Sequence, residues 1–248
     1  MPDANDNAAS SKRRILVLVC ARGGSSGLKN KNILSLAGKP LIAWTIKQAL
    51  NWPSADRVVC STENDEIADI ARSAGAEVPF VRPAELATAT ASKGPVIRHA
   101  LQACEAHFRA HYDLVVDLYP TSPLRTIEDL DKCLEIFDRF RPKTLFSVVP
   151  AQRNPYFNMV EANSNGTARL CKALDGPTFR RQDAPPVYAM NASIYFYRRD
   201  FILEDEDAHA INDDCRFFVM DPISGVDVDS SLDLQYLDFL VRENLVSL

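Results

Sequence analysis

The chain has 248 residues, of which 46% are hydrophobic and 25% are charged, and this apolar content is enough for one sizeable core. Intrinsic disorder and collagen-like order are therefore excluded. Its 28 Lys and Arg residues against 33 Asp and Glu residues give a net charge of −5, which offers no overall attraction to nucleic acid or to an anionic membrane. Any polyanion that binds must meet a local cluster of basic residues.

The apolar stretch 15–21 is far shorter than the roughly 20 residues that a membrane span needs, and it is too short for a signal-peptide core. We therefore expect a soluble protein that stays in the cytoplasm. The 6 cysteines form no Cys-x-x-Cys pair and lie mostly in apolar or helical runs. This pattern indicates reduced thiols rather than disulfides or a zinc site.

Residues 1–14 are polar and without periodicity, which predicts a disordered leader before one domain, 15–248. From Ile15 onwards, short β-rich runs alternate with helical runs. The expected strands are 15–20, 57–61, 77–81, 113–118 and 144–149, and the expected helices are 40–50, 64–74, 94–110 and 127–140. Repeated strand–helix–strand units predict an α/β fold, in which a doubly wound, mostly parallel sheet carries helices on both faces.

This alternation stops after Pro150. Residues 151–190 are rich in Pro and Gly and poor in apolar runs, so we expect them to leave the sheet as an arm or hairpin. Strands are expected again at 193–199, 216–220 and 225–229, and 231–244 is expected to form a closing helix.

The first strand leads into a glycine-rich segment, 21–32, that contains Arg22, Gly23, Gly24, Ser25 and Lys31. Closely spaced glycines let backbone N–H groups turn toward an anion, and the basic side chains add positive charge. The segment matches neither the P-loop pattern nor the dinucleotide pattern. It is a candidate phosphate site because doubly wound sheets bind ligands at the carboxyl ends of their strands; the alternative is an ordinary glycine-rich loop.

Two acidic residues, Asp227 and Asp229, lie in the expected strand 225–229. In an extended segment, residues i and i+2 face the same side, so these carboxylates would project together about 6–7 Å apart, a spacing that suits a hydrated Mg²⁺. The alternative is a solvated strand end or a helix N-cap. A phosphate site in the same sheet favours the metal.

A third acidic residue, Asp117, lies inside the apolar run 114–118 and needs a partner if it is buried. It would either bind the metal from the other side or cap the following loop, and the sequence leaves both open. That loop, 119–125, joins a strand end to a helix and contains Pro120 and Pro123, which limit its freedom. We expect it to hold ligands.

In these segments the chain resembles the acylneuraminate cytidylyltransferase (CMP-sialic acid synthetase) family, and the resemblance covers residues 15–245. It rests on six blocks in order: ARGGSSGLKNKN (21–32), LAGKPLIAWTI (36–46), RPAELATATAS (82–92), PTSPLRT (120–126), NASIY (191–195) and DVDSSLDL (227–234). The resemblance implies a nucleotide-diphospho-sugar transferase-like fold. It also implies that CTP and a nonulosonic sugar acid give a CMP-sugar and pyrophosphate with Mg²⁺, in a homodimer that the arm holds together.

Carried over by position, the resemblance implies a role for each candidate residue. On CTP it places Arg22, Gly23, Gly24, Ser25, Lys31, Asn32, Arg82 and Ser92, with the last three at the cytidine. On the sugar acid it places Tyr119, Thr121, Ser122, Arg181, Asn191 and Tyr195. Asp227 and Asp229 would hold the metal, and the catalytic groups would be Lys31, Arg22 and Asp229, the last as proton acceptor.

The chain departs from the sialic acid pattern at three places. Tyr119 stands where Gln is usual, Ser26 stands where Lys is common, and Ala189-Met190-Asn191-Ala192 replaces Arg-Pro-Asn-Gly. These departures leave legionaminic-type, pseudaminic-type and sialic acids open as the sugar. The alternative functions are a 3-deoxy-manno-octulosonate (Kdo) cytidylyltransferase and a nucleotide-binding homologue without catalysis.

Overall fold

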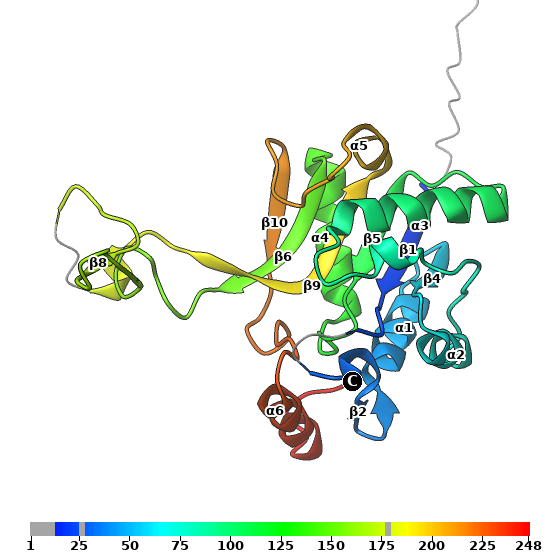
Figure 1. Cartoon of the computed structure of the whole chain (residues 1–248), viewed down its shortest axis with the longest axis horizontal. Coiled ribbons are helices and arrows are strands. Elements are labelled where there is room, and N and C mark those ends of the chain that lie inside the picture. The colour runs from blue at the N-terminus through cyan, green and yellow to red at the C-terminus, as the bar shows by residue number, and fades with distance from the viewer. Residues whose placement is uncertain (1–12, 25–27, 177–179) are drawn as a thin grey trace, which may run out of the picture.

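The computed structural model describes residues 13–24, 28–176 and 180–248. These residues form a six-stranded sheet with the order β10-β6-β9-β5-β1-β4 (Figure 1). Its strands are β1 (Ile15–Cys20), β4 (Arg57–Ser61), β5 (Leu114–Leu118), β6 (Thr144–Pro150), β9 (Tyr188–Arg198) and β10 (Cys215–Val219). All pair in parallel except β9, which lies antiparallel between β5 and β6. The predicted mostly parallel α/β sheet is confirmed.

Helices cover both faces of this sheet. They are α1 (Leu41–Asn51), α2 (Asp65–Ser73), α3 (Lys93–Phe108), α4 (Ile127–Phe140), α5 (Arg199–Glu204) and α6 (Ser231–Arg242). Side chains of α1, α2 and α4 pack on one face, and those of α3 and α5 pack on the other. The longer helices agree with the sequence prediction to within about two residues at each end, the usual uncertainty of helix boundaries.

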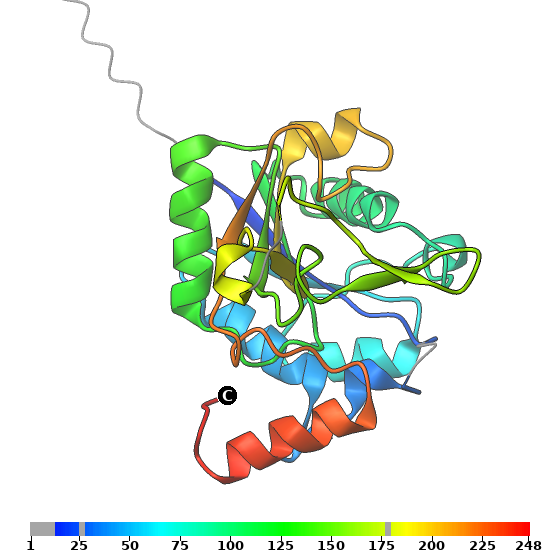
Figure 2. The same cartoon turned by 90° about the vertical axis from the view of Figure 1, so that its left-hand side faces the viewer.

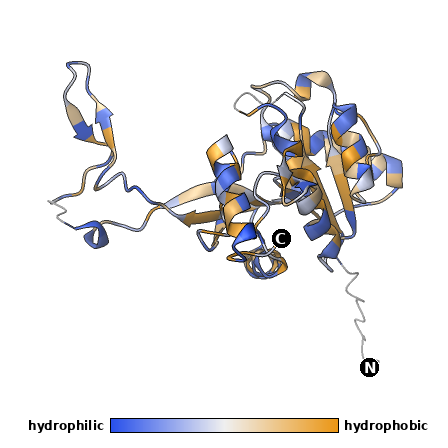
Figure 3. Ribbon diagram, turned by 90° about the horizontal axis from the view of Figure 1, so that it is seen from below, coloured by the Kyte–Doolittle hydropathy of each residue, from blue (hydrophilic) through white to orange (hydrophobic). Residues whose placement is uncertain are grey.

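The centre of the core is β1, which is buried on both faces. Val17 and Val19 point toward the layer of α1, α2 and α4, whereas Leu16 and Leu18 point toward the layer of α3. This explains the unbroken apolar run in the sequence, because a strand covered on both faces needs no polar alternation. Figure 3 shows the hydrophobic colour concentrated in the strands of the sheet.

Two segments that we expected to be strands are not strands. In 77–81, Glu77 forms a single bridge to Val59, and the ladder stops there because Pro79 has no N–H to donate. In 225–229, the chain has just left a turn that ends at Gly225, and the Val228 N–H donates to the Thr121 carbonyl at 2.9 Å instead of to a sheet partner.

The strand expected at 193–199 begins earlier, at Tyr188. Its pairing with β6 changes register between Phe146 and Val148, where Ala192 has a φ of 44°. The Ser147 hydroxyl fills this irregularity because it accepts the Ile194 N–H at 3.0 Å. Such bulges re-aim strands next to functional sites, and this one lies beside the loop 119–125.

Between β6 and β9 the chain forms an arm that projects away from the sheet (Figure 1). It contains β7 (Val160–Ala162), β8 (Ala168–Leu170) and the short 3-10 helix η3 (Arg181–Asp183). The two strands pair only with each other, and all their residues are exposed. The strands β7 and β8 therefore contribute no side chains to the core.

The C-terminal helix α6 packs below the sheet against the segment after β1 (Figure 2). That segment holds η1 (Lys31–Ile33), β2 (Ser35–Leu36) and β3 (Lys39–Pro40), and η2 (Ala84–Leu86) follows β4 and α2. A separate apolar cluster contains Leu36, Trp44, Val228, Leu237 and Leu240. It holds the segment before α6 close to the loop after β1.

None of the helices within the described ranges combines the length and the apolar character that a membrane crossing requires. All six cysteines lie within these ranges and carry free thiols.

Candidate active site

A cavity of about 310 Å³ opens at the carboxyl ends of β1 and β5. Six residues that the sequence singled out line it: Arg22, Lys31, Asn32, Arg82, Tyr119 and Thr121. They come from the loops after β1 and β5 and from the segment between α2 and α3. Parallel strands bring loops that are distant in sequence to the same edge, and this edge is where doubly wound sheets bind ligands.

The glycine-rich segment leaves β1 beside the start of α2. The Gly23 N–H donates to Glu63 Oε1 at 2.7 Å, and a Cβ at Gly23 would lie 2.8 Å from Asn64 Nδ2. Asn64 in turn caps α2 by accepting the Ile67 N–H at 2.9 Å. Glycine is needed here because the two loops approach too closely for a side chain. Ser25 and Ser26 lie outside the described residues.

The basic side chains around the cavity are held by neutral or acidic partners. Arg22 Nη1 donates to the Thr88 carbonyl at 2.7 Å, and Lys31 Nζ pairs with Asp229 Oδ1 at 3.0 Å. Arg82 is buried and donates to the Ser61 hydroxyl at 3.1 Å and to the Ser61 carbonyl. These positive charges converge in a chain whose net charge is −5, which makes the cavity suitable for a polyanion.

Two of the three cytidine candidates, Asn32 and Arg82, line the cavity, and Ser92 is not among its lining residues. The Asn32 side chain is buried and donates to the Arg22 carbonyl at 3.1 Å, so it fixes the loop that carries Arg22. Ser92 is the N-cap of α3 and makes no capping hydrogen bond with its side chain. Its hydroxyl is therefore not engaged by the helix that follows it.

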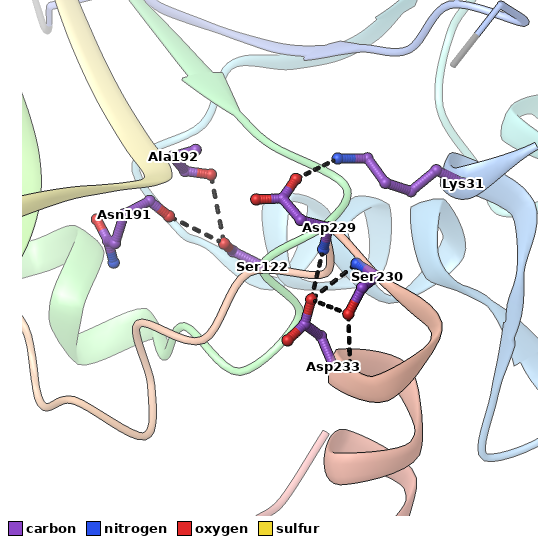
Figure 4. Close-up of polar contacts among 7 residues, drawn as sticks. All are labelled: Lys31, Ser122, Asn191, Ala192, Asp229, Ser230 and Asp233. Carbon is purple, nitrogen blue, oxygen red and sulfur yellow. Dashed lines mark hydrogen bonds and ion pairs between the residues drawn. The ribbon is translucent and has the colours of Figure 1, made fainter. Parts of the chain in front are cut away.

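The two aspartates flank Val228, which is completely buried in the α6 cluster. Asp227 Oδ1 is buried without a hydrogen-bond partner among the described residues, whereas the Asp229 side chain is 78% exposed and pairs with Lys31 (Figure 4). Burial raises the pKa of Asp227 above its ordinary value, and nearby Thr121 and Lys31 act in the opposite direction. An orphaned buried carboxylate oxygen beside an exposed one is a donor set that suits a hard cation.

Neither aspartate is the cap of α6. The helix begins with a capping box in which Ser230 accepts the Asp233 N–H and Asp233 accepts the Ser230 N–H at 2.7 Å. Asp233 Oδ2 also accepts the Asp229 N–H at 3.1 Å (Figure 4). The capping box therefore fixes the backbone of Asp229 and leaves its carboxylate available.

The loop 119–125 depends on Arg125, which is buried at the start of the segment before α4. Its guanidinium donates to the Ser193 hydroxyl at 3.1 Å, to the Ser122 carbonyl at 2.6 Å and to the Tyr119 carbonyl. Burial lowers the pKa of Arg125 to about 9, although nearby Asp117 and Asp227 raise it. The loop is thus folded around the buried Arg125 guanidinium, which is stabilised by hydrogen bonds to neutral oxygens.

The sugar candidates are not all gathered at the cavity. Tyr119 lines it and packs against Tyr195 with ring centroids 5.3 Å apart. Ser122 donates to the carbonyls of Asn191 and Ala192, and the Asn191 side chain bonds Ser147 and Met220, so these groups lie in the interior (Figure 4). Arg181 lines a separate cavity of about 690 Å³ at the base of the arm.

Sequence reasoning missed an ion pair next to the cavity. Asp117 is wholly buried, and its Oδ2 lies 2.8 Å from Nζ of Lys93, which lines the cavity. The sequence named Asp117 but not its partner, because 23 residues, 94–116, which include the rest of α3, lie between the two. The ion pair could have been inferred from a buried acid that follows a helix with a lysine at its first position.

The comparisons with known proteins identify the family of the chain. A cytidylyltransferase family model matches residues 16–212. The chain belongs to the cytidylyltransferase family. It is 43% identical over 227 residues to a CMP-N,N'-diacetyllegionaminic acid synthase of Campylobacter jejuni, with 92% of this chain and 94% of the relative covered. It is 42% identical over 229 residues to a post-translational flagellin modification protein B of Campylobacter coli, with 92% and 95% covered.

The fold of this cytidylyltransferase also matches a solved CMP:2-keto-3-deoxy-manno-octonic acid synthetase complexed with CTP. The TM-score is 0.68, with 93% of this chain and 99% of the other covered. Because the two sequences are only 17% identical, this match supports the fold and not the substrate.

We expect the substitution Arg125→Met to destabilise the cytidylyltransferase by about 3 kcal/mol or more, because it leaves several buried oxygens without donors. The free energy of unfolding, measured in urea, tests this. Arg139→Met is the matched control, since Arg139 is exposed on α4 and should change stability by less than about 0.5 kcal/mol. Equal stabilities for the two variants would contradict the role given to Arg125.

Proposed function

We propose that this cytidylyltransferase transfers CMP from CTP to a legionaminic-type nonulosonic acid and releases pyrophosphate. The observation that carries the proposal is a cavity lined by Arg22, Lys31 and Arg82, with Asp229 paired to Lys31 at its edge and Asp227 two residues before Asp229. The sugar is proposed from the 43% identity to the CMP-N,N'-diacetyllegionaminic acid synthase. It is supported by Tyr119 in place of the Gln of the sialic acid pattern.

The reaction needs positive charge more than covalent chemistry. A hydroxyl on the anomeric carbon of the sugar attacks the α-phosphorus of CTP, and pyrophosphate leaves with the bonding electrons. In such transfers catalysis comes mainly from positioning and from neutralising the phosphate oxygens. Lys31 and Arg22 supply fixed cations for this purpose.

Mg²⁺ is the proposed cofactor, with Asp227 and Asp229 as its protein ligands. When bound, the cation supplies further positive charge to the phosphate oxygens. The unpartnered Oδ1 of Asp227 fits this role, because a buried carboxylate oxygen without a donor gains most from a cation. Two protein carboxylates suit Mg²⁺, which keeps waters and substrate phosphates as its other ligands.

Lys31 connects the proposed triphosphate site to the proposed metal site. In the protein alone its Nζ pairs with Asp229 Oδ1 at 3.0 Å. We propose that the triphosphate of bound CTP pairs with Lys31 in place of Asp229. The Asp229 carboxylate is then available for the metal and for the proton of the attacking hydroxyl. The exposure of Asp229 leaves it free to make this exchange.

Turnover of a panel of sugar acids tests the function. With CTP and Mg²⁺, pyrophosphate release should be fastest with N,N'-diacetyllegionaminic acid and slower with pseudaminic acid, N-acetylneuraminic acid and Kdo. Mass spectrometry of the nucleotide product identifies the sugar that was transferred. Preference for Kdo would instead support the Kdo enzyme, and CTP binding without product would support a nucleotide-binding homologue.

Replacement of one metal ligand tests the cofactor. We expect Asp227→Asn to lower kcat by about 100-fold and to raise the Mg²⁺ concentration for half-maximal rate, because transition-state charge loses a stabilising group. Asp238→Asn is the control, since Asp238 on α6 pairs only with Arg242 at 3.5 Å. Unchanged magnesium dependence in Asp227→Asn would place the metal elsewhere.

We propose that the protein is a homodimer in the cytoplasm and that the arm forms the contact between the two chains. On the arm, Val160 and Leu170 face each other across β7 and β8 and are 63% and 42% exposed. We expect light scattering to give about twice the chain mass of 27.6 kDa, and Val160→Asp with Leu170→Asp to give one chain mass, because charges at a buried contact are costly. Leu232→Asp, at an exposed site on α6, is the control. A monomeric wild type would contradict the dimer.

A further inference from the structure

The buried pair of Lys93 and Asp117 has no role in the function derived so far. Asp117 is in β5 and its side chain is 0% exposed, while Lys93 is the first residue of α3. Lys93 lines the cavity together with Tyr119 and Thr121. The pair therefore connects the interior of the sheet to the ligand cavity.

Asp117 lies in mostly apolar surroundings, although the buried Arg125 guanidinium is also near enough to interact with its charge. It is next to Leu18 in β1 and Tyr195 in β9, within the apolar layer on the α3 face. Neither carboxyl oxygen makes an aligned hydrogen bond within the described ranges, although Oδ2 is 2.8 Å from Lys93 Nζ. A buried carboxylate is costly, so a fold that only needed stability would place an apolar residue here.

Lys93 is held in one position by two contacts. Its ammonium lies 4.1 Å from the centre of the Tyr119 ring, and it pairs with Asp117. Burial lowers the pKa of Lys93, but Asp117 together with nearby Cys20 and Tyr119 raises it above its ordinary value. An ammonium has three N–H donors, and the one pair with Asp117 leaves donors for a ligand in the cavity.

The position of Lys93 separates it from the cations that serve the triphosphate. Arg22 bonds the Thr88 carbonyl and Lys31 bonds Asp229, whereas Lys93 stands over Tyr119, whose ring packs on Tyr195. Thr121, two residues along the same loop, accepts the Val228 N–H between the metal candidates. Tyr119 and Thr121 are thus roughly 7 Å apart along the loop, with a cation at one end and the carboxylates at the other.

We propose that Lys93 binds the carboxylate of the sugar acid, and that Asp117 positions Lys93 for this contact; the inference rests on the proposed function. In a 2-keto sugar acid the carboxylate is attached directly to the anomeric carbon that bears the attacking hydroxyl. A carboxylate at Lys93 would therefore direct that hydroxyl toward the Thr121 end of the loop. The single charge of a carboxylate matches a cation whose own charge Asp117 already balances in part.

The inference makes Lys93 a specificity residue. A neutral sugar would leave the ammonium without its anion, and a sugar whose carboxylate is farther from the anomeric carbon would misplace the hydroxyl. The contact with Lys93 would thus be enough to select 2-keto acids, independently of the contacts made by the rest of the sugar chain.

The test compares Michaelis constants for the two substrates. Lys93→Met alone leaves Asp117 buried without a partner, so the double variant Lys93→Met/Asp117→Leu removes both charges and keeps the fold. With N,N'-diacetyllegionaminic acid as the probe, we expect the double variant to raise the KM for the sugar by about 10- to 100-fold, the usual worth of a charge-assisted hydrogen bond. The KM for CTP should change by less than about threefold, within context-dependent variation.

A sugar analogue gives a second readout that a purely structural role would not move. The wild type should use the C1-carboxamide of the sugar far less well than the acid, and the double variant should discriminate much less between them. Asp117→Asn alone should raise the sugar KM and leave the CTP KM unchanged.

The matched control is Lys143→Met/Asp213→Leu. This pair has the same residue types and the same 2.8 Å separation between its charged atoms. However, it lies at the amino end of β6, and Asp213 is exposed. It should leave both Michaelis constants unchanged.

Three results would overturn the inference. They are a rise in the CTP KM without a rise in the sugar KM, unchanged constants for both substrates, and undiminished discrimination between acid and carboxamide. An inactive wild type with every sugar acid would instead overturn the proposed function and the inference together, so the two failures can be told apart.

Discussion

The structure depends on one constraint, which is that β1 is buried on both faces between β4 and β5. Burial on both faces leaves this strand no polar side, so helices cover it above and below, and its hydrogen bonds are made to the parallel neighbours β4 and β5. Parallel pairing then brings the carboxyl ends of β1, β4 and β5 to one edge. Every loop that contributes to the cavity begins at that edge, so the position of the site follows from the packing of the core.

The cavity is shaped by groups that never reach a ligand. Arg125 gathers the carbonyls of the loop 119–125, Glu63 holds the Gly23 N–H, and the burial of Val228 places an aspartate on each side of it. The Gly23–Glu63 hydrogen bond and the packing of Val228 connect segments that are distant in sequence, and Arg125 joins its own loop to Ser193 of β9. They explain why Tyr119, Thr121 and the two aspartates have fixed positions although none of them lies in a strand or helix.

The sequence predicted what local pattern controls. Unbroken apolar runs located β1, β4, β5 and β6, and helical spacing located the four longer helices between and beyond them. It failed where pairing is decided by distant partners. The bridge at Glu77 ends at Pro79, the segment around Val228 bonds Thr121 rather than a strand, and β9 enters antiparallel with a bulge at Ser147. For the site, motifs identified residues one segment at a time, so they named Asp117 but could not give its partner.

The Lys93–Asp117 pair shows how a residue that no motif identified can contribute to the site. Motif residues such as Arg22 and Lys31 are half-buried in the segment after β1, where a charge is less costly than in the middle of the sheet. A carboxylate at 0% exposure in the middle of a sheet is different, because its desolvation has to be offset by nearby cations, and Lys93 contacts it at 2.8 Å. The lysine reaches the cavity from the start of α3, so the cost of the buried acid is explained most directly by the position that it imposes on the cation. Specificity for an anionic acceptor then originates in the core of the fold and not in the loops alone.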